Sequence, residues 1–288
     1  MLIIGSHTKF LKDSQLVGCV LESLEYGSNA FMFYTGSNQS TERSEIDDEK
    51  TNEAFALMKV NNIDINNVVV HAPFIINLAN NSDERKYNFY ITFLKKEINR
   101  CIKLGVKKLI LHPGSRVGIE TEIALNNIIY GLNKALEDIE NFDVILEFMS
   151  GKGSEVGSSI DDFVYIYSGI EKKDMVSICI DTCHMNDAGI DLNDFNIFLD
   201  EFDKKIGIEK IHAVHVNDSQ NIIGSHKDRH ANIGYGTIGF NILLGIVYNK
   251  RLENIPKILE TPYYSEIAPY KHEIDNFKNK EFKDFINK

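Results

Sequence analysis

Histidines and carboxylates recur where short apolar runs of this sequence end. Each run is rich in Ile, Val, Leu or Phe and finishes on a polar or Gly/Pro cluster. The metal-capable residues at or just after these ends are His7, His71, His112, Glu147, Asp181, His184, His215, Asp228, His230 and Glu260. Imidazole nitrogens mixed with carboxylate oxygens suit zinc, with manganese or iron as weaker fits. Because one zinc ion takes about four ligands, a set of this size predicts a cluster of ions.

The carboxylates predict the chemistry of such a cluster. A glutamate such as Glu147 has two oxygens and can bridge two ions, and a bridged pair can hold a hydroxide between them. Clusters of this kind catalyse in-line phosphoryl displacement because they stabilise both the attacking and the leaving oxygen. We therefore predict catalytic roles for Glu147, Asp181 and Glu260. Taken singly, a strand-end histidine such as His71 is more often a structural hydrogen-bonding group, so the prediction of metal binding depends on the whole set.

The apolar runs also predict the fold. They lack polar alternation, which is typical of strands buried on both faces. The eight runs are Leu2–His7, Ala30–Thr35, Val68–Pro73, Lys108–Gly114, Val144–Phe148, Val176–His184, Ile211–Asp218 and Ile258–Pro262. Amphipathic segments between them, such as Ser82–Leu104 and Glu120–Ile139, predict helices. Eight strand–helix units predict an α/β protein with a single (β/α)8 TIM barrel over residues 1–288, whose active site lies at the C-terminal ends of the strands. The alternative, a doubly wound open sheet, lacks a G-x-G-x-x-G after the first run.

Composition restricts the class of protein. The 288 residues are 43% hydrophobic and 25% charged, an ordinary globular balance. No apolar run approaches the roughly 18 residues of a membrane span, and the N-terminus lacks the basic region of a signal peptide, so we expect a cytoplasmic protein. Four scattered cysteines fit reduced thiols. The net charge of −11 argues against a broad basic surface for nucleic acid, although bound divalent ions would add positive charge locally.

Three histidines are not expected to take part in the site. His212 has the opposite strand parity to His215 and should face the helices. His226 lies in a polar loop and His272 in a C-terminal helix, so both are predicted to be solvated.

Several separated motifs resemble one known family. They are His112-Pro113-Gly114, Asp181-Thr182-Cys183-His184, His215-Val216-Asn217-Asp218-Ser219, Asp228-Arg229-His230 with Asn232-Ile233-Gly234, and Leu259-Glu260-Thr261-Pro262. In this order they are similar to endonuclease IV, the family of zinc-dependent apurinic/apyrimidinic endonucleases also called deoxyribonuclease IV. The likeness extends from Gly5-Ser6-His7 to the C-terminal helix.

The resemblance implies a barrel that carries three zinc ions. Transferred residue by residue, His71, His112 and the bridging Glu147 would hold the first ion. Glu147, Asp181, His215 and Glu260 would hold the second, and His184, Asp228 and His230 the third. The family repairs double-stranded DNA by cleaving the backbone 5′ to an abasic sugar, leaving a 3′-hydroxyl and a 5′-deoxyribose phosphate, and it trims blocked 3′ ends. A zinc-held hydroxide is the nucleophile. A monomer is the simplest expectation for an enzyme whose barrel mouth must stay open to DNA.

The resemblance also has departures, which concern how the lesion is probed. Segment 35–41 resembles the family's DNA-probing loop, but only Arg43 supplies positive charge nearby, and Phe74 stands where many members have tyrosine. Glu147 is followed by Phe148-Met149-Ser150, where many members have a smaller or more polar residue directly after the glutamate. Since the abasic nucleotide must reach metals inside a pocket, it should flip out of the stack. The residues expected to contact or replace it are His7, Asn38, Gln39, Phe74 and Arg229.

Two other classes of function fit part of the pattern. A xylose-isomerase-like sugar isomerase or epimerase shares the barrel and binds a divalent metal at the same strand ends. It needs mostly carboxylates and one or two histidines, so His184, Asp228 and His230 would have no role. A zinc-stabilised binding module predicts closed four-ligand sites, usually with cysteines.

Overall fold

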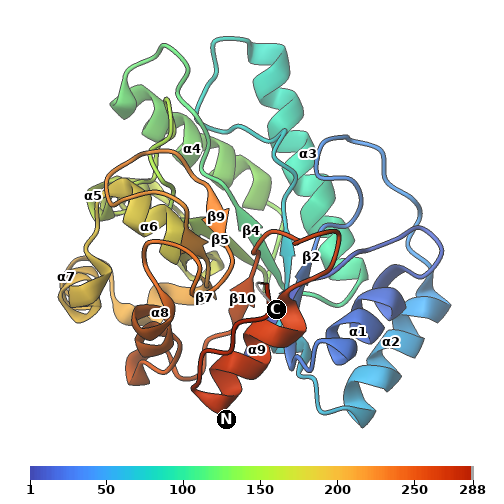
Figure 1. The fold of residues 1–288 in the computed structure, drawn as a ribbon. Helices are drawn as coiled ribbons and strands as arrows, with labels where there is room; N and C mark the ends of the chain where they lie inside the picture. The colour runs from blue at the N-terminus through green and yellow to red at the C-terminus, as the bar shows by residue number, and fades with distance from the viewer. Residues whose placement is uncertain (287–288) are drawn as a thin grey trace.

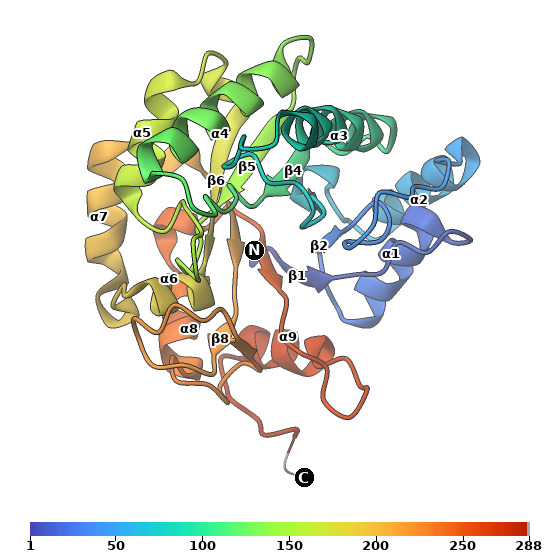
Figure 2. The same cartoon turned by 90° about the horizontal axis from the view of Figure 1, so that it is seen from above.

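Parallel strands form the centre of the computed structural model, which describes residues 1–286. Within those residues eight strands close into a barrel in the order β1-β10-β7-β6-β5-β4-β3-β2 (Figures 1 and 2). The strands are β1 (Ile4–His7), β2 (Ala30–Phe33), β3 (Val68–His71), β4 (Lys108–Leu111), β5 (Asp143–Glu147), β6 (Val176–Asp181), β7 (Ile211–His215) and β10 (Lys257–Leu259). All eight neighbouring pairs are parallel, so the predicted TIM barrel is confirmed.

A ring of helices surrounds the barrel, as the view from above in Figure 2 shows. The α-helices are α1 (Gln15–Glu25), α2 (Asp48–Val60), α3 (Glu84–Lys103), α4 (Thr121–Leu136), α5 (Ile160–Gly169), α6 (Thr182–Ala188), α7 (Phe195–Lys205), α8 (Phe240–Val247) and α9 (Tyr270–Asn279). Short 3-10 turns occupy Ile65–Asn67, Lys173–Met175, Leu192–Asp194, Ile208–Lys210 and Lys250–Leu252. The two helices predicted from their spacing, Ser82–Leu104 and Glu120–Ile139, correspond to α3 and α4 with slightly shorter bounds.

The core has two layers because each strand is apolar on both faces. The barrel interior is filled by Ala30, Met32, Val69, Ile110, Ile145, Cys179, Ala213 and Ile258, all fully buried. The alternate residues of the same strands pack outward against the helices. Gly5 in β1 is required by this packing, since a Cβ at that position would lie 1.7 Å from the Ala30 carbonyl oxygen of β2.

Asp181 ends the sixth strand earlier than the sequence predicts. The apolar run continues to His184, but the side chain of Asp181 accepts a hydrogen bond from the His184 N–H at 2.8 Å and caps α6. His184 therefore lies in the first turn of a helix, and not at the end of a strand.

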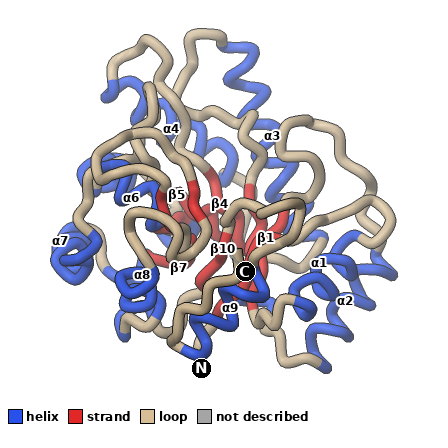
Figure 3. Tube along the Cα trace, in the orientation of Figure 1, coloured by secondary structure: helices blue, strands red, loops and turns tan. Residues whose placement is uncertain are grey.

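A two-stranded hairpin that the sequence pattern does not predict lies beyond β7. It consists of β8 (Asp218–Ser219) and β9 (His230–Ala231), which pair in antiparallel register. The buried Asp218 carboxylate accepts hydrogen bonds from the backbone N–H groups of Gly234, Gly236 and Ile238, and so fixes the loop after β9. Figure 3 shows the loops that follow the strands gathered on the upper side of the barrel. In residues 1–286 no helix combines the length and the apolar character needed to cross a bilayer.

Candidate metal centre

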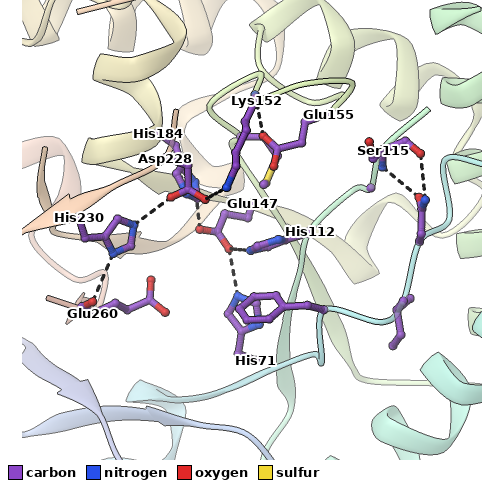
Figure 4. Close-up of a pocket in the computed structure, with 15 residues that line it drawn as sticks. His71, His112, Ser115, Glu147, Lys152, Glu155, His184, Asp228, His230 and Glu260 are labelled. Atoms are coloured by element: carbon purple, nitrogen blue, oxygen red, sulfur yellow. Dashed lines mark hydrogen bonds and ion pairs between the residues drawn. The ribbon is translucent and has the colours of Figure 1, made fainter. Parts of the chain in front are cut away.

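Glu147 lies at the centre of the candidate site (Figure 4). It is the last residue of β5 and is buried, with 1% of its surface exposed. Its Oε2 lies 3.1 Å from Nε2 of His71 and 3.1 Å from Nε2 of His112. Its Oε1 lies 3.1 Å from Nδ1 of His215 and 3.3 Å from Nδ1 of His184. Each carboxylate oxygen thus faces a different pair of imidazoles.

A second group surrounds His215 at the end of β7. Its Nδ1 lies 2.9 Å from Oε2 of Glu260 and 3.8 Å from Oδ2 of Asp181. Ligand atoms of Glu147, Asp181, His215 and Glu260 all lie within 4.8 Å of one another. Three of these residues are buried, and Glu260 faces the cavity.

A third group joins α6 to the β8–β9 hairpin. Nε2 of His184 lies 3.1 Å from Oδ1 of Asp228, and Nε2 of His230 lies 3.5 Å from the same oxygen. The third group is not isolated from the second, because His230 Nε2 also lies 3.9 Å from Asp181 Oδ2. The buried thiol of Cys183, which the sequence pattern does not indicate as a ligand, lies within 4.8 Å of ligand atoms of Asp228 and His230.

Backbone carbonyls orient three of the imidazoles. His71 donates from Nδ1 to the Ala72 carbonyl at 2.7 Å, and His184 donates from Nδ1 to the Phe148 carbonyl at 2.9 Å. Nδ1 of His230 lies 3.2 Å from the Glu260 carbonyl. Because a carbonyl only accepts, each contact places the proton on Nδ1 and leaves Nε2 free to bind an ion.

Asn217 bonds the carboxylate of Asp181 and the backbone of Glu260. It is fully buried after β7, and its Nδ2 donates to Asp181 Oδ2 at 2.6 Å. Its Oδ1 accepts from the Glu260 N–H at 2.9 Å. One side chain therefore sets the position of Asp181 and Glu260, on either side of His215.

The site has the electrostatics of a cation-binding centre. Burial alone would raise the pKa of Glu147, but His215 and His112 hold it well below its usual value. Burial alone would lower the pKa of His184, but Asp181, Asp228 and Glu147 hold it well above its usual value. In addition, Nε2 of His230 is buried and has no hydrogen-bond partner among residues 1–286. Convergent carboxylates that need positive charge, together with an imidazole nitrogen that faces them without a hydrogen bond, fit divalent metal ions.

A cavity of about 560 Å³ opens above these residues. Its lining includes Phe74, Met149 and Lys152, in addition to all the candidate ligands except Asp181 and His215. Nζ of Lys152 lies 3.8 Å from Oδ2 of Asp228 (Figure 4). The sequence does not single out Lys152, because this residue follows β5 by five residues in a polar stretch with no motif of its own.

The residues predicted to contact DNA lie in different places. Phe74 is 52% exposed at the cavity rim, with its ring 5.2 Å from that of His112. His7 and Asn38 line a second cavity of about 940 Å³ beside the loop after β2. Gln39 and Arg229 are exposed and line neither cavity.

The exposed positive charges near the loop after β2 belong to lysines and not to Arg43, the one cation that the sequence indicates there. Arg43 is not available to a ligand, because its buried side chain pairs with Glu97 at 2.8 Å. Lys9, Lys12 and Lys96 line the same cavity and are exposed.

The remaining histidines lie outside the three groups. His212 sits near the start of β7 and pairs with Asp143 at 2.6 Å, at the opposite end of the barrel from the site. His226 is exposed and its Nδ1 lies 2.8 Å from the Ser150 carbonyl oxygen. His272 is exposed on α9, where its ring stacks on Phe285.

The fold and the clustered ligand residues define a protein of the xylose isomerase-like TIM barrel class. The profile of the family described as "Xylose isomerase-like TIM barrel" matches residues 20–280. A probable endonuclease 4 from Mesoplasma florum is 45% identical over 284 residues, which cover 97% of each chain. Another from Bacillus subtilis is 43% identical over 292 residues, covering 99% of this chain and 98% of the relative. The chain belongs to the endonuclease IV family.

Solved structures agree with this assignment. The crystal structure of endonuclease IV from Thermus thermophilus superposes with a TM-score of 0.83 at 26% identity, over 96% of this chain and 97% of the other. A D-tagatose 3-epimerase-like protein superposes with a TM-score of 0.69 at 20% identity, over 96% of each chain. The second likeness concerns the fold alone.

Proposed function

We propose that this protein is a zinc-dependent apurinic/apyrimidinic endonuclease of DNA repair. It hydrolyses the phosphodiester 5′ to an abasic site, leaves a 3′-hydroxyl and a 5′-deoxyribose phosphate, and trims blocked 3′ ends. The observation that carries the proposal is the position of Glu147, whose two oxygens face separate pairs of imidazoles. That arrangement suits a carboxylate that bridges two ions, as phosphodiester hydrolysis by a metal pair requires.

Three ions are assigned to the three groups. His71, His112 and Glu147 hold the first, Glu147 with Asp181, His215 and Glu260 hold the second, and His184, Asp228 and His230 hold the third. Three divalent ions outweigh the four carboxylates of these groups and leave the site positive, as a phosphodiester substrate needs. Bound ions of this type lower the pKa of water and stabilise charge on a phosphoryl group.

The side chains around the ligands bind and orient the substrate. Lys152 adds an exposed positive charge in the lining of the cavity, where it can contact a phosphate beside the third group. Phe74 supplies an exposed aromatic ring that can stack on a base next to the flipped sugar. His7, Asn38, Gln39 and Arg229 are assigned to the DNA around the lesion, with His7 and Asn38 lining the cavity beside the loop after β2.

A sugar isomerase is the rival function on the same fold. Barrels of this type include epimerases, and the fold does not separate the two functions. The ligand set does, because a single-metal isomerase needs mostly carboxylates and one or two histidines, so the His184–Asp228–His230 group would have no role. We also propose that the protein acts in the cytoplasm, where its four buried free cysteines would stay reduced. We propose further that it is a monomer with a single catalytic domain.

Incision of a defined oligonucleotide tests the proposal. A duplex with one abasic site should be cut by zinc-loaded protein to products with a 3′-hydroxyl and a 5′-deoxyribose phosphate, and cutting should stop after chelation. An undamaged duplex of the same sequence is the control. Epimerisation of ketohexoses by the same preparation, without incision of the abasic duplex, would refute the endonuclease and support the isomerase.

A further inference from the structure

Asp228 has a backbone conformation that needs support. This candidate ligand of the third ion has φ +55°, in the left-handed region that residues other than glycine rarely adopt. It lies in the 220–229 loop between β8 and β9, which also contains His226 at φ +51°. Such a conformation persists only where surrounding contacts determine it.

The side chain of Asp187 provides that contact. Its Oδ2 accepts a hydrogen bond from the Asp228 N–H at 2.8 Å and a second from Asn221 Nδ2 at 2.9 Å. Its Oδ1 accepts from Ser219 Oγ at 2.8 Å and from Asn186 Nδ2 at 3.0 Å. Asp187 is fully buried, and a carboxylate suits this position because all four of these groups are donors.

The position of Asp187 on α6 gives these contacts a functional meaning. It lies three residues after His184 in the same short helix, so the two side chains project from the same side. His184 faces Oδ1 of Asp228 at 3.1 Å (Figure 4), while Asp187 holds the backbone of Asp228. Asp187 is not a member of any of the ligand groups found in residues 1–286.

We propose that Asp187 is a positioning residue that sets the geometry of the third metal site through the backbone of Asp228. The inference rests on the proposed three-ion function and deepens it. Helix α6 then provides one ligand directly and fixes a second, so the two move as one unit. Residues that orient metal ligands typically affect affinity by about 10- to 100-fold when changed.

The substitution Asp187→Asn is a sharp test because the side chain keeps its size. An amide has only one acceptor oxygen, so in either orientation its NH2 group meets at least one N–H donor. We expect zinc affinity at the third site to fall at least tenfold, while the ions shared by Glu147 stay bound. Asp187→Glu keeps the charge but displaces it by one methylene, so it should cause the same selective loss of zinc from the third site. This variant serves as the test if the amide variant does not fold.

Asp143→Asn is the matched control. Asp143 is a half-buried acceptor, bonded to Ser177 Oγ at 2.7 Å and to His212, but it lies at the opposite end of the barrel. Each zinc-loaded variant is titrated with a chelator, and both the ions released and the absorption spectrum of cobalt-substituted protein are measured. The control should lose thermal stability with an unchanged release curve. Asp187→Asn should release one ion at lower chelator concentration and alter the cobalt spectrum.

His230→Ala separates the two possible failures. If this variant binds as many ions as the parent, the third site itself is wrong, and the role of Asp187 falls with it. If His230→Ala loses one ion but both Asp187 variants release zinc as the parent does, only the positioning role is refuted. Loss of all ions from folded Asp187→Asn would also refute it, because the effect would not be selective.

Discussion

His71 and His112 direct their Nε2 atoms at the same oxygen of Glu147, each at 3.1 Å. The other oxygen of Glu147 faces His215 at 3.1 Å. A carboxylate whose two oxygens serve different partners can share its charge between two ions.

Replacing Glu147 with Gln should lower kcat on abasic DNA by several orders of magnitude with substrate affinity largely kept. An amide has one acceptor oxygen where the bridge needs two, so the paired ions lose their shared ligand. Single-turnover cleavage and equilibrium binding of the same duplex measure the two effects. Glu137→Gln, at an exposed position after α4, is the control. Cleavage by Glu147→Gln within tenfold of the parent would show that Glu147 is not the bridge.

Purified protein should contain about three divalent ions per chain, mostly zinc, because its ligand set exceeds what one or two ions take. Elemental analysis of a preparation with measured specific activity gives the ratio. A fully active preparation with one ion per chain would contradict the cluster and favour the isomerase.

Substitution of His230 by Ala should remove one ion and leave the fold intact. His230 faces Asp228 and Asp181 but does not contact Glu147, so the ions shared by Glu147 keep their ligands. We expect kcat to fall far more than substrate binding weakens, because an ion held there would stabilise charge that develops during the reaction. His226→Ala is the matched control, since His226 lies four residues earlier in the same chain segment and belongs to none of the ligand groups. Equal metal content and near-normal cleavage in both variants would rule out a third site at His230.

DNA affinity should depend only weakly on salt. Arg43 is committed to Glu97, so Lys9, Lys12 and Lys96 are the exposed cations that line the cavity beside the probing loop. A few neutralised phosphates give a slope of log K against log salt of about −4 or shallower. Lys12→Ala should reduce the slope by about 1, whereas Lys250→Ala, on the 3-10 turn that precedes β10, should not change it. A parent slope near −8 would reveal a basic groove formed by other residues.

The buried carboxyl of Glu273 should make stability depend on pH. Glu273 lies on α9 and accepts hydrogen bonds from the Ile233 N–H and from Asn232, and Thr261 donates to its other oxygen. Burial raises the pKa of Glu273 to about 7, and these hydrogen bonds offset only part of the shift. The folded state therefore binds this proton more tightly than the unfolded state does. The contribution to stability is fully present below about pH 4.5 and is lost as pH rises through about 7, by roughly 1 kcal/mol per pH unit.

Glu273→Gln isolates that contribution, because the amide stays neutral at every pH. Relative to the parent, the variant should gain stability as pH rises from 5 to 8, as measured by urea unfolding. Other titrating groups, including the candidate ligands, affect both proteins alike and cancel in the difference. The exposed Glu281→Gln serves as the control. A difference between Glu273→Gln and parent that does not change with pH would mean that Glu273 ionises normally.

The barrel and most of the candidate site could be predicted because strand ends leave a local signal in the sequence. His71, Glu147 and His215 each close a run of apolar residues, and the strand ends of a closed barrel meet at one face whatever the spacing between them. The sequence indicates His184 as a candidate ligand but does not show that it lies in a helix. The cap formed by Asp181 turns a continuous apolar run into a strand followed by a helix, and periodicity does not distinguish the two over so few residues.

The parts that could not be predicted depend on contacts between distant segments. The β8–β9 hairpin brings Asp228 and His230 to α6, and it is fixed by Asp187, 41 residues before Asp228. Arg43 appeared to be a free charge because its partner Glu97 lies 54 residues away. Lys152 has no motif, and only the cavity reveals it. Such pairings are set by tertiary packing, and a single sequence carries no local trace of them.

The candidate ligands lie at or just after the ends of six barrel strands or in the β8–β9 hairpin, from His71 after a quarter of the chain to Glu260 near its end. Within each ion's set the ligands come from separate strand ends or from the hairpin, so no contiguous segment of the chain can assemble a complete coordination sphere. The chain should therefore bind zinc tightly only after the barrel has closed, because a nascent or partly folded chain lacks a complete set of ligands. Conversely, ions that bind only the closed barrel shift the folding equilibrium toward it, by an amount that grows with the logarithm of free zinc. The zinc supply of the cell would then set not only the activity of this repair enzyme but also how much of it stays folded.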